Sequence, residues 1–315
     1  MRAGVVAATV LALTAVAPLR GRVSEAADVR EPLTPPVAAG ALRPVSTRRY
    51  VMSGKVRPLL FWIGKDDIGV ARIVWRRGEG GGVGYEFLVG TDPAKAPRAL
   101  NRWGYIAEDV EGTGGSLLAL MTGADEGSYA DAESSAARPP GAGDFRAISS
   151  RVGGGATTWQ TARVTTPSAL TVHDVDAALD RVRHETSAVA ARTMPLPTGA
   201  RPGFLTAVAE LLDRAVRSVH DHSDLRALTR ARVTYVFGQG AYELQVREAE
   251  PIRIDRGGES VPAVRTGFEI RTLTTNVRTR FELTSGTSGE LAGVPLAISW
   301  QPRWWLQVAL RLEGN

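Results

Sequence analysis

Apolar and polar side chains alternate at every second position through the C-terminal part of this 315-residue chain, from Arg232 to Trp300. Successive side chains of a β-strand point to opposite faces, so the alternation predicts strands that bury one face. Short glycine-containing segments such as Gly238-Gln239-Gly240 separate the runs and favour tight connections between antiparallel neighbours. The pattern predicts an antiparallel meander with these apolar positions on one face: Val233, Tyr235, Phe237, Tyr242, Leu244, Val246, Phe268, Ile270, Val277, Phe281, Leu283, Val294, Leu296, Ile298 and Trp300.

The N-terminal half carries the same signal in shorter runs. Alternation between Tyr50 and Asp92 predicts strands, with Gly64-Lys65-Asp66-Asp67 as a first hairpin connection and the glycine-rich segment Gly78 to Gly84 as a second. Two further strands are expected at Phe145 to Val152 and at Ala156 to Thr165, joined by a run of glycines. These segments indicate that the chain is strand-rich on both sides of its middle.

The middle of the chain has helical periodicity instead. Apolar residues from Val172 to Val182 recur at three- and four-residue steps, and Thr171 with Asp174 forms a loose capping pair, so a helix is predicted from His173 to about Ala190. A second helix is expected after Pro202-Gly203, because one apolar stripe follows it. That stripe consists of Phe204, Val208, Leu211, Leu212, Ala215 and Val219.

Together these signals predict a mainly β fold of the α+β type. Many short strands with brief turns favour a curved antiparallel meander that forms a clam or open barrel, since open edges invite aggregation. The two helices are inserted between the strand-rich halves. We expect one β-rich domain over residues 45–315, with its helical insert at about 172–228, preceded by a Pro- and Ala-rich disordered linker over residues 27–44.

The first 26 residues resemble a secretory signal peptide. Met1-Arg2 precedes a small and apolar run, and Ser24-Glu25-Ala26 offers a cleavage site. This predicts export to the periplasm or the cell exterior. The alternative is an uncleaved anchor, favoured by Arg20 and Arg22 directly after the run, and membrane contact is expected only through this segment if it stays uncleaved.

Composition excludes several classes of site. The chain has no cysteine, so disulfides, thiol catalysis and cysteine metal sites are impossible. Its net charge is +5, and removing residues 1–26 takes away three arginines and one glutamate and leaves +3. Basic residues are interspersed with acidic ones, which argues against nucleic acid as a partner, because phosphate binding requires clustered charge.

The histidine cluster His220-Asp221-His222 is the one candidate for metal chemistry, because imidazole and carboxylate groups are zinc ligands. It stands where the second helix is expected to end, a place where histidine interacts favourably with the helix dipole. A solvated helix end is therefore the preferred interpretation. No Gly-x-Ser-x-Gly elbow occurs, since Gly286 to Glu290 departs from it at the last residue. We predict neither a catalytic set nor a cofactor.

A loop and the C-terminal strand supply the candidate ligand-binding residues. Arg98, Arg102 and Trp103 combine guanidinium groups with an aromatic ring, which suits anionic or flat ligands, although Trp103 shares a strand face with Tyr105, which favours packing in the core. Near the C-terminus, Pro302 is expected to break or bulge the strand path. In the strand that follows, one face is core, and Trp305 beside Arg303 stays a candidate for binding.

The segment FWIGKDDIGVARIVWRR places Gly64 and Gly69 before an alternating strand, and the chain closes with FELTSGTSGELAGVPLAISWQPRWWLQVALRL. Both segments resemble exported bacterial proteins of unknown function whose antiparallel sheet curves into a β-clam. The resemblance covers about a third of the chain. It implies a clam-like fold and an envelope location, and it implies no activity, ligand or functional residue.

Three functions remain open from the sequence. The leading hypothesis is a non-enzymatic exported module that binds an apolar or amphipathic small molecule, or an envelope protein, in the concavity of its sheet. The alternatives are a metal-dependent hydrolase that uses His220 and His222, and a structural or assembly factor of the cell envelope.

Overall fold

The computed structural model describes residues 42–57, 62–122, 143–184, 191–221, 224–303 and 306–314. The predicted signal peptide and nearly all of the predicted linker lie outside these residues, as do His222 and Trp305. The described part of the chain contains the strands β1 (Leu42–Val56), β2 (Ile63–Gly78), β3 (Val83–Thr91), β4 (Trp103–Glu111), β5 (Gly114–Met121), β6 (Gly143–Gly153), β7 (Ala156–Thr166) and β8 (Arg192–Pro195). It continues with β9 (Arg232–Phe237), β10 (Gly240–Arg256), β11 (Glu259–Thr272), β12 (Arg278–Gly286), β13 (Pro295–Arg303) and β14 (Leu306–Leu312).

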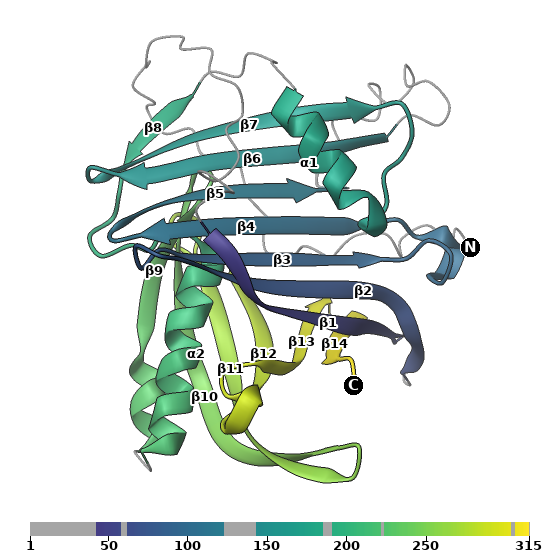
Figure 1. Cartoon of the computed structure of the whole chain (residues 1–315), viewed down its shortest axis with the longest axis vertical. Coiled ribbons are helices and arrows are strands. Elements are labelled where there is room, and N and C mark those ends of the chain that lie inside the picture. The colour runs from purple at the N-terminus through teal and green to yellow at the C-terminus, as the bar shows by residue number, and fades with distance from the viewer. Residues whose placement is uncertain are drawn as a thin grey trace.

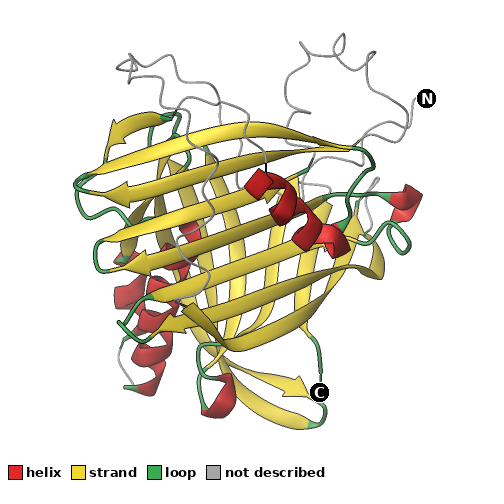
Figure 2. Ribbon diagram, turned by 45° about the horizontal axis from the view of Figure 1, so that its top comes forward, coloured by secondary structure: helices red, strands yellow, loops and turns green. Residues whose placement is uncertain are grey.

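All fourteen strands of the described residues belong to one antiparallel sheet, in the order β8-β7-β6-β5-β4-β3-β2-β1-β14-β13-β12-β11-β10-β9 (Figure 1). Neighbours in the sheet are neighbours in sequence except at its centre, where β1 pairs with β14 and places Tyr50 opposite Leu312. The sheet curves strongly (Figure 2). This confirms the prediction of a mainly β fold built from a curved antiparallel meander.

The two end strands of the sheet, β8 and β9, are not paired with each other, and one residue that follows β8 in the sequence forms an isolated bridge to β9. After β8, the backbone of Arg201 bridges to Tyr235 in β9, with Arg201 N–H donating to the Thr234 carbonyl at 2.8 Å. Val236 N–H donates back to the Arg201 carbonyl at 3.1 Å. These bonds cover part of the edge of β9, so the sheet is open but its terminal strand is not fully exposed.

Helix α1 (Val175–His184) covers the outer face of the sheet. Its residues Val175, Ala178 and Val182 are buried in a cluster with side chains from β3 to β7, among them Trp103 and Phe145. In Figure 1 this helix crosses in front of those strands. The strands in this half are therefore packed on both faces, which explains why so many of their side chains are buried at consecutive positions.

Helix α2 (Phe204–His220) covers the inner face. Its buried residues, such as Leu211, share one cluster with Ile106 and Leu117 from β4 and β5 and with Leu244 and Phe268 from β10 and β11. A helix can contact both halves of the curved sheet only from the concave side. The apolar stripe found in the sequence thus places α2 inside the fold.

One predicted connection is wrong. The segment Gly64 to Asp67 was expected to be a hairpin turn, whereas β2 runs through it without reversing. The register against β1 shifts between Met52 and Gly54, so the turn-forming residues produce a β-bulge, with Asp67 at a positive φ of 51°. The glycine segment after Gly78 does form the expected connection, between β2 and β3. The predicted helical insert also contains β8 between its two helices.

The start of α1 is capped as predicted. A short 3-10 turn over Val172–Asp174 precedes the helix, and the Asp174 carboxylate accepts a 2.8 Å hydrogen bond from Thr171 N–H. The Thr171 hydroxyl in turn accepts from His173 N–H at 3.2 Å. Residues beyond His184 that were assigned to this helix lie outside the described part as far as residue 190.

Replacing Thr171 with alanine is expected to lower the free energy of unfolding by about 1 kcal/mol, because the first turn loses its side-chain cap. Urea denaturation of both proteins measures the difference. The matched control is Ser168→Ala in the same connection, where the exposed side chain caps nothing. Equal stabilities of the Thr171 variant and the parent would contradict the capping role.

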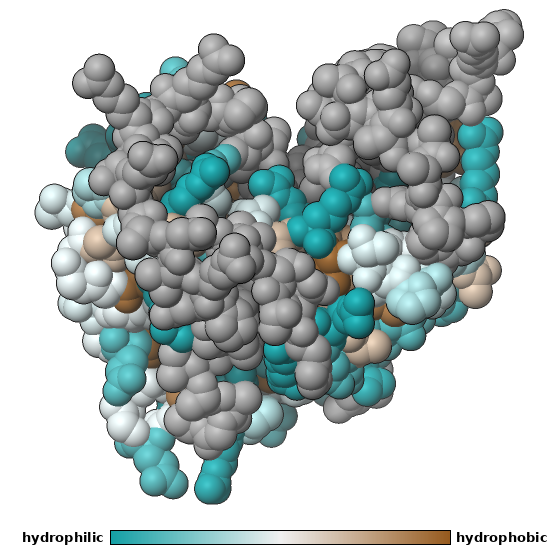
Figure 3. Space-filling model, turned by 90° about the horizontal axis from the view of Figure 1, so that it is seen from above, coloured by the Kyte–Doolittle hydropathy of each residue, from teal (hydrophilic) through white to brown (hydrophobic). Residues whose placement is uncertain are grey.

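On the face seen from above, the visible described residues are mainly hydrophilic or of intermediate hydropathy, with a few apolar ones among them (Figure 3). Exposed large hydrophobic side chains in the described part of the chain are Val45, Trp62, Ile63, Leu273 and Val277. Within the described ranges, every helix is too short or too polar to span a membrane.

Candidate functional site

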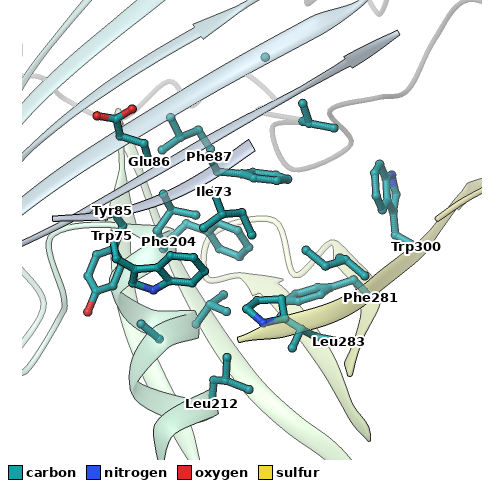
Figure 4. Close-up of a pocket in the computed structure, with 18 of the residues that line it drawn as sticks. Ile73, Trp75, Tyr85, Glu86, Phe87, Phe204, Leu212, Phe281, Leu283 and Trp300 are labelled. Atoms are coloured by element: carbon teal, nitrogen blue, oxygen red, sulfur yellow. The ribbon is translucent and has the colours of Figure 1, made fainter. Parts of the chain in front are cut away.

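An apolar pocket opens inside the curved sheet, between α2 and the inner faces of β2–β4 and β12–β13 (Figure 4). We call it the tryptophan pocket, after Trp75 and Trp300. Its lining residues are Ile73, Trp75, Tyr85, Glu86, Phe87, Val89, Gly104, Ile106, Phe204, Leu205, Val208, Ala209, Leu212, Thr279, Arg280, Phe281, Leu283, Pro295, Ile298 and Trp300.

One wall of the pocket comes from alternate residues of neighbouring strands. In the register of β2 with β3, Ile73 lies opposite Phe87 and Trp75 lies opposite Tyr85. Cross-strand partners share a face of the sheet, so all four side chains point inward. The sequence predicted alternating strands between Tyr50 and Asp92, and tertiary structure shows that the face carrying Ile73 and Trp75 is the concave one.

The opposite wall is formed by β12, β13 and the first turns of α2. Phe281 is paired with Trp300, and Leu283 with Ile298. The Phe281 ring stacks on Phe268 with centroids 4.9 Å apart and meets Phe204 of α2 edge-on at 5.9 Å. Phe281 packs on these two rings, and both Phe281 and Trp300 remain half-buried at the pocket surface.

The pocket contains unfilled space. The volume not occupied by protein atoms is about 1130 Å³, including the part open to solvent. The inner part accommodates a slender apolar group, and a larger ligand would extend into the open part. Partly exposed aromatic rings around a concave space are typical of small-molecule sites.

No charge is free inside the pocket among the described residues. The Glu86 carboxylate points away from the other labelled side chains (Figure 4) and forms an ion pair with Arg76 at 3.3 Å. The guanidinium of Arg280 binds Glu269 at 2.9 Å. The apolar lining therefore favours an uncharged group as the occupant, because an unpaired charge is costly to bury.

Three ring groups in the lining can donate hydrogen bonds to a ligand. The indole N–H groups of Trp75 and Trp300 and the hydroxyl of Tyr85 form no hydrogen bonds within the described ranges. Burial, with the nearby Glu108 carboxyl adding to it, raises the pKa of Tyr85 above its usual value. The phenol thus stays protonated near neutral pH, and all three groups are donors that suit a neutral acceptor.

A buried glutamate on β4 fixes the position of α2 and so the shape of the pocket. Glu108 is fully buried and accepts hydrogen bonds from Leu205 N–H at 2.7 Å and from both N–H and hydroxyl of Thr206 at 2.8 Å. Its carboxyl group caps the helix N-terminus, where unpaired N–H groups attract negative charge. Burial raises the pKa of Glu108 to about 7, and the hydrogen bonds oppose this rise.

Gly203, the residue before α2, is required by this close approach. A Cβ atom at this position would lie 2.2 Å from the carboxyl carbon of Glu108. The backbone of Gly203 is extended, so glycine is needed here for space and not for an unusual conformation. The Pro202-Gly203 pair, after which the sequence predicted the second helix, is therefore also where α2 contacts β4.

The predicted loop residues lie away from this pocket, since none of Arg98, Arg102 and Trp103 lines it. Trp103 is fully buried beneath α1, and its indole N–H donates to the Leu170 carbonyl at 2.9 Å. The structure thus places this side chain in the core, the second of its two interpretations. Arg98 is exposed and Arg102 is half-buried in the loop before β4, and ligand binding by them stays a prediction.

The remaining candidates are placed only in part. Arg303 ends β13, with the backbone irregular between Trp300 and Arg303 as expected around Pro302, and Trp305 lies outside the described residues. His220 is the last residue of α2, as predicted. Metal binding by His220 and His222 stays a prediction, because His222 also falls outside the described part. In the ranges that are described, no three His, Cys, Asp or Glu side chains form a metal-binding group.

Sequence reasoning missed the aromatic residues of the pocket. Trp75, Phe87 and Phe281 were assigned to strands, and Trp300 was assigned to packing. Each lies at the inward-facing position of its strand, so the alternation contained part of the signal. That β2 and β3 lie across the pocket from β12 and β13 is a long-range property, and the local sequence pattern does not contain it.

No protein-family model matches the sequence, and no curated protein matches it significantly. Among solved structures, the fold is similar to the crystal structure of a beta-barrel-like protein of domain of unknown function DUF1849 from Brucella abortus. The TM-score is 0.37 at 9% sequence identity, over 85% of this chain and 96% of that chain. That protein is itself described as of unknown function.

Proposed function

We propose that this protein is a non-enzymatic binding protein that holds an apolar or amphipathic ligand in the tryptophan pocket. The observation that carries the proposal is the concave, partly open space lined by half-buried aromatic rings on both of its facing walls. Apolar surface left exposed in a concavity is stabilised when a ligand displaces water from it.

The lining suggests the ligand's chemistry. An acyl chain or a flat apolar ring system fits the enclosed part, because all charged groups of the lining are already paired elsewhere. A neutral acceptor, such as an ester or ketone oxygen, can reach the donors of Trp75, Tyr85 or Trp300. A charged head group is expected to remain in the open part, in contact with water.

The proposal includes export to the periplasm or the cell exterior, supported by the signal-like residues 1–26. An envelope protein that inserts an apolar side chain into the pocket is the alternative occupant. Fractionation of cells that produce the full chain, with mass measurement of the product, tests export. Cytoplasmic protein that retains its N-terminus would contradict it.

Binding can be tested with the apolar dye Nile red, whose fluorescence rises in an apolar site. Ala209→Trp is expected to abolish the signal, because the new side chain occupies the pocket from α2. Trp300→Ala is expected to weaken binding about tenfold or more, as an aromatic contact worth about 1.5–3 kcal/mol is lost.

The matched control is Trp159→Ala. Trp159 is half-buried on β7, stacks with Arg192 at 5.4 Å and does not line the pocket, so dye affinity should be unchanged. Native mass spectrometry of the purified parent protein then identifies any molecule that copurifies. Saturable dye binding that Ala209→Trp leaves intact would place the site elsewhere and contradict the proposal.

A further inference from the structure

A second hollow lies on the outer face of the sheet and has the opposite chemistry. It is formed by β9 to β12, on the face that α2 does not cover, and we call it the arginine hollow. Its lining is entirely polar: Arg232, Glu243, Gln245, Arg247, Glu269, Arg271 and Arg278. The centre of a water-sized sphere can reach about 170 Å³ here. A single water needs about 10–15 Å³ of such space, so a small polyatomic ion has ample room.

Two glutamates hold the arginines in place. Glu269, whose side chain is 4% exposed, binds Arg280 at 2.9 Å and Arg278 at 3.5 Å. Glu243 binds Arg271 at 3.1 Å. The carboxylates lie at the base of the hollow and are less exposed than the guanidinium groups, so these ion pairs restrain Arg271 and Arg278 beside it before a ligand binds.

The hollow keeps an excess of positive charge, since four arginines face two glutamates in its lining. Arg271 and Arg278 are direct cross-strand partners, an arrangement of like charges that destabilises a sheet. The Nε atom of Arg271 is buried and has no hydrogen-bond partner in the described ranges. Arg247 has one side-chain contact there, a 3.5 Å interaction with Gln245. A bound anion would offset the excess positive charge, reduce the repulsion between Arg271 and Arg278 and give Arg247 a charged partner.

We propose that the arginine hollow binds a phosphate-type oxyanion, either free or as the head group of a lipid. Guanidinium groups present paired N–H donors in the plane that matches two oxygens of a phosphate. The site is compact, and Glu243 and Glu269 offset half of its positive charge, which suits one phosphate group and not the extended backbone of a nucleic acid.

Calorimetric titration of the full chain with inorganic phosphate at low ionic strength tests the proposal. Saturable binding is expected, and Arg271→Gln and Arg278→Gln should each weaken it about tenfold or more, because each removes a charge-assisted hydrogen bond. The matched control is Arg265→Gln, which removes the same charge from β11. Arg265 pairs with Glu250 at 2.9 Å and Glu282 at 3.8 Å and does not line the hollow, so its affinity should equal that of the parent.

Arg278→Gln also separates binding from folding. It removes one of two facing like charges and also the 3.5 Å ion pair with Glu269, which keeps Arg280 at 2.9 Å, so its melting temperature without phosphate is expected to stay close to that of the parent. Phosphate should raise the melting temperature of the parent and of Arg265→Gln, and leave that of Arg278→Gln nearly unchanged.

Sedimentation with phosphatidylcholine vesicles, with and without phosphatidic acid, distinguishes the two sources of phosphate. Binding to phosphatidic acid vesicles that depends on Arg271 and Arg278, without binding of inorganic phosphate, would assign the hollow to a lipid head group. Binding of inorganic phosphate without binding to phosphatidic acid vesicles would assign the hollow to a free anion. The proposal is overturned if neither probe binds, or if Arg265→Gln weakens binding as much as the two hollow variants do, since the attraction would then depend on net charge alone.

Discussion

Replacing Trp103 with alanine is expected to lower the free energy of unfolding by about 3–5 kcal/mol, the usual cost of removing a large aromatic side chain from a core. Trp103 is fully buried, and its ring lies 5.8 Å from that of Phe145 beneath α1. Few neighbours can move into the space, because α1 and the loop at Leu170 close it. Urea denaturation followed by circular dichroism measures the loss.

Two further variants show whether the loss in Trp103→Ala comes from packing. Trp103→Phe keeps most of the ring volume and loses the indole hydrogen bond to Leu170, so about 1 kcal/mol is expected. Trp62→Ala removes an exposed tryptophan, 38% of whose surface is accessible, and should change stability by about 0.5 kcal/mol or less. A Trp103→Ala protein as stable as its parent would contradict the core assignment and return this residue to the candidates for binding.

The buried carboxyl of Glu108 is expected to make stability depend on pH. Its pKa is raised from 4.5 to about 7 in the folded chain, mainly by burial. Below pH 4.5 the group is protonated in both the folded and the unfolded state. As the pH rises, the unfolded state ionises first, so the stability due to this group falls and is fully lost above pH 7. A difference of this size corresponds to about 3 kcal/mol.

The comparison with Glu108→Gln isolates this contribution. Carboxyls with lowered pKa values, such as Asp92, Asp174 and Glu210, make the opposite contribution at lower pH, and they do so equally in both proteins. The difference in unfolding free energy between parent and variant should therefore fall by about 3 kcal/mol between pH 4.5 and pH 7. Parallel pH profiles would show that Glu108 does not titrate in this range.

The predictions agree with the structure for the strands, and they disagree with it at one predicted turn. Alternation located the strands of both halves because burying one face of a strand is a local periodic requirement, as in β9 and β10. Gly64 to Asp67 was misassigned because the same residue types serve turns and bulges. The deciding factor was the pairing of β2 with β1, which continues beyond these residues to Ile63.

The sequence predicted a concavity in a curved sheet, and it did not identify the residues that line the tryptophan pocket. The binding candidates taken from the sequence were in a loop and at the C-terminus, because arginine beside tryptophan is conspicuous in a sequence. The actual lining consists of ordinary inward-facing strand residues such as Phe87 and Phe281, which become a site only where two walls face each other.

The sequence by itself determined the strand periodicity, the two helices with their starts at Thr171 and Gly203, and the absence of cysteine chemistry. These are properties of neighbouring residues, and neighbouring residues suffice to reveal them. Only the tertiary structure decided which face of each strand is concave, that Glu108 meets the start of α2, and that Arg271 stands opposite Arg278. Those contacts join positions far apart in the chain, and they arise from strand register and sheet curvature, which no local pattern contains.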